Sequence, residues 1–252
     1  MSIEGKVALV TGGSGTLGKE HCLSLAKAGC NVAITGHRHL EKAEAVAKEV
    51  TCIGRKALAF RMDIANMDEV QAGVNMIKKE LGSVDILVNN AAFGIIRGVT
   101  LVKMDKQDWD RDLNVNLTGA FNTIKCCMPD MIERCWGRII NITSISGTMG
   151  GFGQCSYAAT KAGLIGLTKT VALEGARKGI TCNAVVLGVF DSNRFHEVTP
   201  EFRDRIIKRL AMRRSGDPQE LSNVVVFLAS EESSYLTGEA IEVSGGASLF
   251  TF

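Results

Sequence analysis

TGGSGTLG (residues 11–18) follows the apolar run KVALV (6–10) near the start of the chain. This order predicts a strand, a glycine-rich turn and a helix start, whose backbone N–H groups and dipole bind a pyrophosphate. The glycines fit two registers. Gly13, Gly15 and Gly18 have the spacing G-x-G-x-x-G, whereas Gly12 and Gly18 fit a longer pattern in which Thr16 stands where a glycine is expected. The strand–turn–helix context favours phosphate binding over a purely structural turn.

Short apolar runs alternate with helical patterns along the whole chain. The expected strands are residues 6–11, 31–35, 57–62, 85–89, 138–142, 180–186 and 240–244. Apolar residues with 3.6-residue spacing lie between them, for example over 67–81 and 219–228. Because several strands are apolar on both faces, helices should cover both sides. The sequence therefore predicts an α/β fold: a Rossmann-like, doubly wound seven-stranded parallel sheet with helices on both faces, in a single domain over 1–252.

Composition argues against several classes of protein. The net charge of +2 at pH 7 gives no pull towards nucleic acid or a membrane surface, so neither is an expected partner. No apolar run approaches the ~18–20 residues that cross a bilayer, and MSIEGK at the N-terminus is not a signal peptide. The eight cysteines form no CxxC pair, so no metal site or disulfide framework is expected. Unpaired thiols indicate a cytoplasmic location.

The residues after the second expected strand bear on the choice of cofactor. In such a unit the residue that contacts the adenosine ribose lies about 20 residues beyond the glycines. Here the chain reads Thr35-Gly36-His37-Arg38, without a carboxylate until Glu41. A carboxylate would bind a 2′-hydroxyl and repel a 2′-phosphate, and an arginine does the reverse. Arg38 therefore favours NADP(H), with NAD(H) as the alternative if Arg38 is a solvated surface charge.

Tyr157 and Lys161 stand in YAATK (157–161), inside an expected helix over 157–173. Their four-residue spacing places phenol and ammonium on one helical face. A nearby lysine cation should lower the pKa of the tyrosine and make it an acid and base usable near neutral pH. Ser144 follows the expected strand 138–142 and would lie at the carboxyl edge of the sheet, where ligands bind in this architecture. The three residues together indicate an active site, whereas a YxxxK pair alone is usually structural.

Further motifs accompany these residues: Asp63 in RMDIA, NNAA (89–92) and Asn116 in NVNLTG. With TGGSGTLG and the Ser144, Tyr157 and Lys161 set, they make the chain similar along its whole length to the single-domain short-chain dehydrogenase/reductases. The stretches 153–185 and 235–247 are especially similar to β-ketoacyl thioester reductases. Gluconate-type polyol dehydrogenases are nearly as similar.

The resemblance implies reversible hydride transfer between a nicotinamide cofactor and a secondary alcohol/ketone pair. A 3-hydroxyacyl thioester, a polyol or a cyclic alcohol would fit, and a CoA thioester is a candidate partner. Tyr157 would exchange the hydroxyl proton, Lys161 would bind the nicotinamide ribose, Ser144 would hold the substrate oxygen and Asn116 would support a water. The expected cofactor-binding residues are Gly12, Ser14, Gly15, Thr16, Leu17, Gly18, His37, Arg38, Asp63, Ile64, Asn90, Ala91, Tyr157, Lys161, Gly188, Val189 and Ser192.

Three positions depart from the family pattern, and we expect all of them on the cofactor side. Thr16 replaces a glycine, Ala92 replaces the glycine of NNAG, and Leu187 replaces the proline before Gly188. They motivate an alternative function, a non-catalytic subunit that pairs with an active sister chain. The intact catalytic set favours the enzyme, which by resemblance would be a homotetramer.

Residues 192–214 correspond by resemblance to the substrate lid and carry an excess of basic side chains. These are Arg194, Arg203, Arg205, Lys208, Arg209, Arg213 and Arg214. They would meet the anionic tail of a CoA or carrier-protein substrate, or else form a solvated helix face. Cys155 is expected to line the pocket rather than react, because no base partner is evident. The apolar end LFTF (249–252) is expected at a subunit contact.

Overall fold

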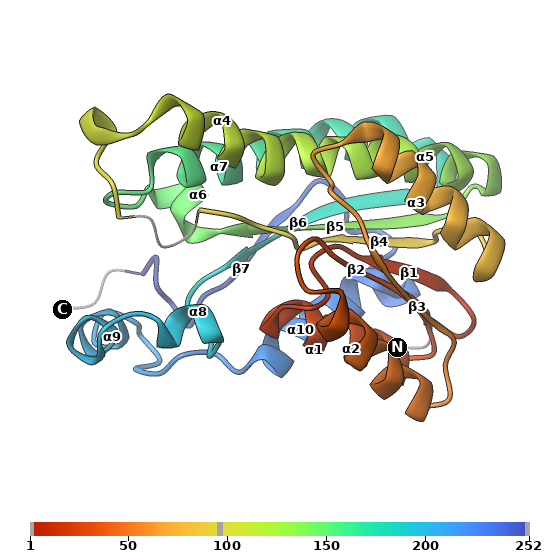
Figure 1. The fold of residues 1–252 in the computed structure, drawn as a ribbon, viewed down its shortest axis with the longest axis horizontal. Coiled ribbons are helices and arrows are strands. Elements are labelled where there is room, and N and C mark those ends of the chain that lie inside the picture. The colour runs from red at the N-terminus through yellow and green to blue at the C-terminus, as the bar shows by residue number, and fades with distance from the viewer. Residues whose placement is uncertain (1–2, 95–97, 250–252) are drawn as a thin grey trace.

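The computed structural model describes residues 3–94 and 98–249, whose seven strands form one parallel sheet (Figure 1). The strand order is β3-β2-β1-β4-β5-β6-β7. The bounds are β1 (Val7–Val10), β2 (Asn31–Gly36), β3 (Ala57–Arg61), β4 (Ile86–Asn89), β5 (Gly137–Ser144), β6 (Ile180–Leu187) and β7 (Ala240–Val243). Each expected strand is confirmed to within two residues at either end, and so is the predicted fold class.

Helices fill the connections between the strands. They are α1 (Thr16–Lys27), α2 (Leu40–Cys52), α3 (Met67–Glu80), α4 (Lys106–Leu113), α5 (Gly119–Arg134), α6 (Ile145–Met149), α7 (Cys155–Gly175), α8 (Asn193–His196), α9 (Pro200–Ile207) and α10 (Pro218–Ala229). A π-helical turn, Asn114–Thr118, joins α4 to α5. Helix α10 contains the expected helical pattern over 219–228, and it starts at Pro218, where the Asp217 side chain accepts from the Gln219 N–H. Within the described ranges, no helix is both long and apolar enough to span a membrane.

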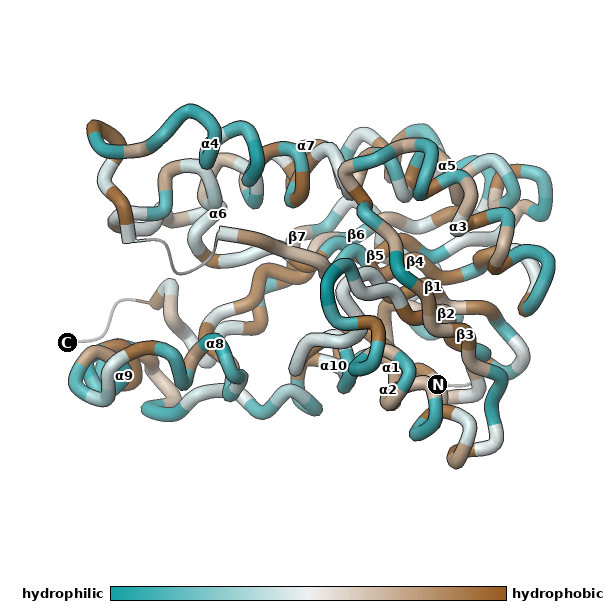
Figure 2. Tube along the Cα trace, viewed as in Figure 1, coloured by the Kyte–Doolittle hydropathy of each residue, from teal (hydrophilic) through white to brown (hydrophobic). Residues whose placement is uncertain are grey.

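The sheet separates two apolar cores. Successive side chains of a strand point to opposite faces, so Ala8 and Val10 of β1 pack with α1, α2 and α10, whereas Leu9 packs with α3, α5 and α7. Figure 1 shows these two groups of helices on opposite sides of the sheet. Figure 2 shows the apolar residues concentrated along the central strands. This double burial is the physical reason for the continuous apolar runs in the sequence.

Because all strands are parallel, their carboxyl ends meet at one edge of the sheet. TGGSGTLG leaves this edge after β1, Asn90 after β4, and Gly188 after β6, while Ser144 ends β5. The strand order reverses between β1 and β4, which opens a crevice at that edge. Helices α6, α8 and α9 lie on the same side in Figure 1. The fold thus gathers the expected site residues along one border.

Candidate active site

The turn after β1 has the geometry of the longer glycine register. Gly12 has φ +64°, and a Cβ there would lie 2.9 Å from the Ala91 Cα atom. A Cβ on Gly18 would lie 2.3 Å from the Gly12 carbonyl oxygen. Gly15, which only the shorter register requires, has φ −82° and no heavy atom closer than 3.5 Å to such a Cβ. A Cβ on Gly13 would lie 2.7 Å from Ile34, so the turn needs glycine at 12, 13 and 18 but not at 15, and α1 begins at Thr16.

Hydrogen bonds of Asn90 connect this turn to the end of β4. Its side-chain amide donates to the carbonyl oxygens of Thr11 at 2.9 Å and Gly12 at 3.2 Å. In return, the Thr11 hydroxyl accepts from the backbone N–H groups of Asn90 and Ala91 at 3.0 and 3.1 Å. These bonds connect the two sides of the crevice, so the backbone N–H groups of the turn are held in place before any ligand arrives.

The expected adenosine-binding residues lie beyond the ends of β2 and β3. His37 and Arg38 are exposed, and the His37 Nε2 atom lies 3.8 Å from a carboxylate oxygen of Asp63. The Arg38 guanidinium lies 5.9 Å from the ring centre of Phe93. Ile64 lines a small pocket with Ala91 and Asn116. The Ser14 side chain lies next to Gly36, at the end of β2.

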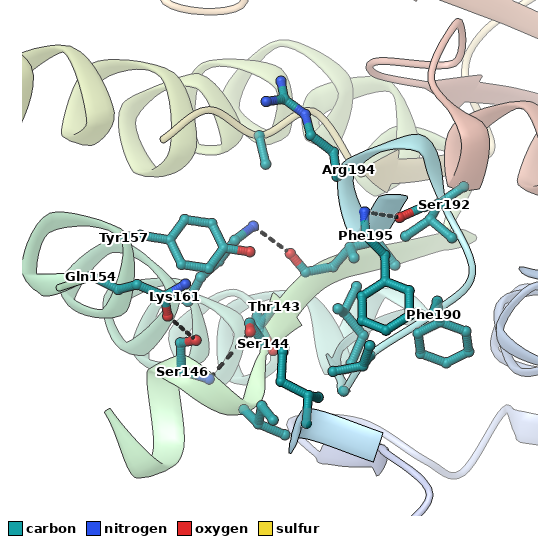
Figure 3. A pocket seen from close by; sticks show the side chains of 18 of the residues that line it. Thr143, Ser144, Ser146, Gln154, Tyr157, Lys161, Phe190, Ser192, Arg194 and Phe195 are labelled. Carbon is teal, nitrogen blue, oxygen red and sulfur yellow. Dashed lines mark hydrogen bonds between the residues drawn. The ribbon is translucent and has the colours of Figure 1, made fainter. Parts of the chain in front are cut away.

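A cavity of about 400 Å³ lies at the carboxyl edge of the sheet, with its side chains drawn in Figure 3. Of the expected catalytic residues, Ser144, Tyr157 and Lys161 line it. The expected cofactor residues that line it are Thr16, Leu17, Asn90, Tyr157, Lys161, Gly188, Val189 and Ser192. Gly188 must be a glycine here, because a Cβ would lie 2.6 Å from the Ser244 Cα atom.

Tyr157 and Lys161 are almost fully buried, with 4% and 2% of their surface exposed. Burial raises the pKa of Tyr157 to about 12, opposed by its hydrogen bond with Ser144. Burial also lowers the pKa of Lys161 to about 8. The Lys161 ammonium donates to the Ile142 carbonyl at 2.7 Å and lies 5.6 Å from the Tyr157 ring centre. The pKa of Tyr157 is therefore raised rather than lowered as expected, because desolvation is the larger effect.

Unlike Ser144, Tyr157 and Lys161, the fourth expected catalytic residue, Asn116, does not line the cavity. It lies in the π-helical turn, where its amide accepts from the Phe93 N–H at 2.7 Å and donates to the Phe93 carbonyl at 3.0 Å. It also donates to the Thr160 hydroxyl at 3.3 Å, and that hydroxyl donates to the Tyr157 carbonyl at 2.7 Å. The Asn116 side chain thus holds backbone segments on either side of the site.

Sequence reasoning missed two polar neighbours of Ser144. The Ser146 N–H donates to the Ser144 hydroxyl at 3.2 Å, and the Ser146 hydroxyl donates to the Gln154 side chain at 2.7 Å. Figure 3 shows this chain of bonds below Tyr157. Gln154 precedes Tyr157 by three residues, about one helical turn, and that spacing was the available signal.

The apolar wall of the cavity was also missed. Its members come from α6, α8, α9 and the loops around them: Ile145, Phe152, Phe190, Phe195, Val198, Phe202 and Ile206. Residues 195, 198, 202 and 206 recur every three or four positions, a spacing that signals apolar burial, and the structure divides them between α8, the following loop and α9.

All three departures from the family pattern line the cavity: Thr16, Ala92 and Leu187. Cys155 does not line it, so the expectation of a pocket wall is wrong; it is the first residue of α7. Residues 250–252 of the apolar end lie outside the described residues.

The basic residues of 192–214 differ in whether they reach the cavity. Arg194 lines the cavity and lies 3.8 Å from Glu197. Arg214 pairs with Glu220 at 2.6 Å, and Arg203 contacts a ring nitrogen of His196 at 2.8 Å. Arg194 is therefore the member of this set that is placed to meet a substrate.

Comparison with known proteins agrees with this geometry. The family model described as short chain dehydrogenase matches residues 6–202. The chain is 42% identical over 241 residues to the 3-oxoacyl-[acyl-carrier-protein] reductase FabG of Staphylococcus epidermidis, covering 96% of this chain and 98% of the relative. Nodulation protein G of Azospirillum brasilense is also 42% identical, over 96% of this chain and 97% of its own.

Solved structures have the same fold. A "putative gluconate dehydrogenase" from Agrobacterium tumefaciens matches with a TM-score of 0.94 and 31% identity, over 99% of this chain and 98% of that one. A "putative short-chain alcohol dehydrogenase" from Sinorhizobium meliloti matches with a TM-score of 0.93 and 31% identity, over 99% of both chains. These similarities favour the enzyme over the non-catalytic subunit. The chain is an NAD(P)-dependent oxidoreductase acting on a secondary alcohol/ketone pair, and it belongs to the short-chain dehydrogenase family.

Proposed function

We propose that the chain interconverts 3-oxoacyl and 3-hydroxyacyl thioesters with NADP(H). One observation carries the choice of substrate: the cavity beside Ser144 and Tyr157 is walled by apolar side chains from α8 and α9. An acyl chain buried there gains about 0.8 kcal/mol per methylene. A polyol would lose hydrogen bonds to water at the same wall without regaining them. The name of the staphylococcal relative, a 3-oxoacyl-[acyl-carrier-protein] reductase, supports the same class of substrate.

The residues present fit a dinucleotide. Gly12 and Gly18 let the turn pack tightly on itself and on Ala91, so that the start of α1, with Thr16 and Leu17, borders the cavity. Arg38 would bind the 2′-phosphate of NADP(H), while Lys161 and Ser192 would hold the nicotinamide end. The nicotinamide supplies or accepts the hydride when it is bound.

Proton transfer falls to Tyr157. With a pKa of about 12 its phenol is protonated at neutral pH, so a proton is available for the oxygen of a ketone. Ser144, which is hydrogen-bonded to Tyr157, would hold that oxygen. The buried Lys161 cation, 5.6 Å from the Tyr157 ring centre, would stabilise the phenolate left behind. These groups are already in place, so little rearrangement is needed.

The substrate tail and the assembly complete the proposal. Arg194 lines the cavity and would meet the phosphate of a CoA or carrier-protein thioester. A homotetramer is supported by the exposed apolar side chains of Phe121 on α5 and Leu173 on α7, 45% and 83% exposed. Light scattering after gel filtration would test the tetramer; a monomeric mass would overturn that part.

The substrate assignment is tested by NADPH oxidation with 3-oxoacyl-CoA esters of increasing chain length, in parallel with acyl-carrier thioesters, keto-gluconate and a cyclic ketone. We expect kcat/KM to rise by up to about fourfold for each methylene that enters the wall. Phe202→Ser should flatten this dependence, and Arg205→Gln, exposed on the same helix and outside the cavity lining, is the matched control. Equal turnover of keto-gluconate would contradict the proposal.

A further inference from the structure

Thr16 connects the glycine turn to the far end of the chain. Its hydroxyl oxygen accepts a hydrogen bond from the backbone N–H of Asn193 at 3.4 Å, across 177 residues of sequence. Thr16 is the first residue of α1, and Asn193 is the first residue of α8. Helix α8 with α9 carries the apolar wall of the cavity, and Thr16 lines the same cavity. The bond therefore joins the phosphate side of the crevice to its substrate side.

The donor in this bond is an amide that α8 does not satisfy itself. Ser192 precedes α8 in an extended conformation, φ −155° and ψ 159°, and its hydroxyl accepts from Phe195 rather than from Asn193. The first N–H groups of a helix have no partner within it, so an acceptor from elsewhere stabilises the helix start. Thr16 supplies that acceptor. The glycine that the family pattern has at this position carries no side-chain oxygen.

The Thr16 hydroxyl has capacity for a second partner. A hydroxyl has one proton to donate and two lone pairs that accept. With one lone pair used by Asn193, the proton can still be donated to a pyrophosphate oxygen at the start of α1. One side chain can thus contact the cofactor and α8 at the same time.

We propose that Thr16 is a positioning residue that couples cofactor binding at the glycine turn to the seating of α8 over the substrate cavity. The proposal rests on the proposed function, because it assigns the cavity to the acyl substrate. Coupling of this kind is reciprocal: cofactor tightens substrate binding, and substrate tightens cofactor binding by the same factor.

Four single variants test the hydrogen bond, two at its acceptor Thr16 and two at its donor Asn193. Thr16→Val keeps the shape and removes the hydroxyl, whereas Thr16→Ser keeps the hydroxyl. Asn193→Pro removes the donor N–H without touching Thr16. Proline is tolerated at the first position of a helix, and Ser192 already has the extended backbone that precedes a proline. Asn193→Ala keeps the N–H and is its matched control.

The expected result is a change in substrate KM at saturating NADPH. Losing one hydrogen bond should raise KM for a 3-oxoacyl-CoA ester by about two- to tenfold in Thr16→Val and Asn193→Pro. Thr16→Ser and Asn193→Ala should keep the wild-type KM. The double variant Thr16→Val/Asn193→Pro should be no worse than Thr16→Val alone, because both changes delete the same bond.

Hydrogen exchange provides a readout that needs no substrate. NADP(H) should slow amide exchange over 190–206 in the wild type and in Thr16→Ser, and this protection should be lost in Thr16→Val and Asn193→Pro. Wild-type KM and full protection in both of these variants would overturn the proposal, as would additive effects in the double variant. If the wild type protects this segment but does not reduce 3-oxoacyl esters, the substrate assignment fails while the coupling stands.

Discussion

The two ends of the crevice differ in burial. On α7, beside the end of β5, the proposed catalytic residues Tyr157 and Lys161 are buried and hydrogen-bonded, and desolvation shifts their pKa values. Beyond the end of β2, His37 and Arg38 are exposed on the loop that leads to α2. The proposed function thus places proton transfer where the protein excludes water, and cofactor choice where side chains can be exchanged without disturbing the core. The buried end should therefore respond to substitution far more strongly than the exposed end.

The largest effect should follow Tyr157→Phe, which removes the transferable proton and keeps the ring. We expect turnover to fall by roughly 10²–10⁴ or more. The affinity for NADP(H), measured by fluorescence titration, should be retained because the glycine turn is untouched. If the Phe variant kept a third of wild-type turnover, the role assigned to Tyr157 would be wrong.

Arg38→Leu probes the exposed end. Charge-assisted hydrogen bonds to a phosphate are worth ~1.5–3 kcal/mol each, so the Kd of NADP(H) should rise by about ten- to a hundredfold. The Kd of NAD(H) should stay nearly constant, since it has no 2′-phosphate. Calorimetric titration of both cofactors gives the comparison. Equal losses for the two, or a wild-type preference for NAD(H), would contradict the NADP(H) assignment.

The pH dependence sharpens the contrast in burial. Lys161 is protonated below its lowered pKa of about 8, and Tyr157 stays protonated up to about 12. If reduction needs both protons, kcat/KM should be level below pH 8 and fall about tenfold per unit above it. Steady-state rates from pH 6 to 9.5 would show this. A profile that stays flat to pH 9.5 would remove Lys161 from the proton-linked step.

The smallest effect is expected at the exposed substrate side. Arg194→Gln should raise KM for acyl-CoA esters by up to about fivefold at low salt, the range of exposed ion pairs. The effect should fade as salt rises, because exposed charges are screened over ~8–10 Å. Small neutral ketones should be unaffected, and Arg205→Gln is the matched control. An equal change in KM for neutral ketones would mean that Arg194 belongs to a solvated helix face and does not contact the substrate.

Much of the site was readable because its signals are local. The central strands are continuous apolar runs because helices bury both of their faces, and the spacing of Tyr157 and Lys161 follows from the helical period of 3.6 residues. Asn116 was found only by resemblance, and its place apart from the cavity was not foreseen. The apolar wall was missed because residues 195, 198, 202 and 206 divide between two short helices and the loop that joins them, among many charged residues.

The sequence alone determined the sheet, its order of elements and the edge at which the site lies, because strand and helix periods and turn glycines act between near neighbours. The tertiary structure decided the rest. Burial in the folded chain raises the pKa of Tyr157. Tertiary packing also brings the Asn116 side chain into hydrogen bonds with the Phe93 backbone, and the Thr16 hydroxyl into a hydrogen bond with the Asn193 N–H. Each of these features arises when segments far apart in the chain pack together and exclude water or form a contact. A local pattern of residues specifies neither which distant segments meet nor how deeply a side chain is buried.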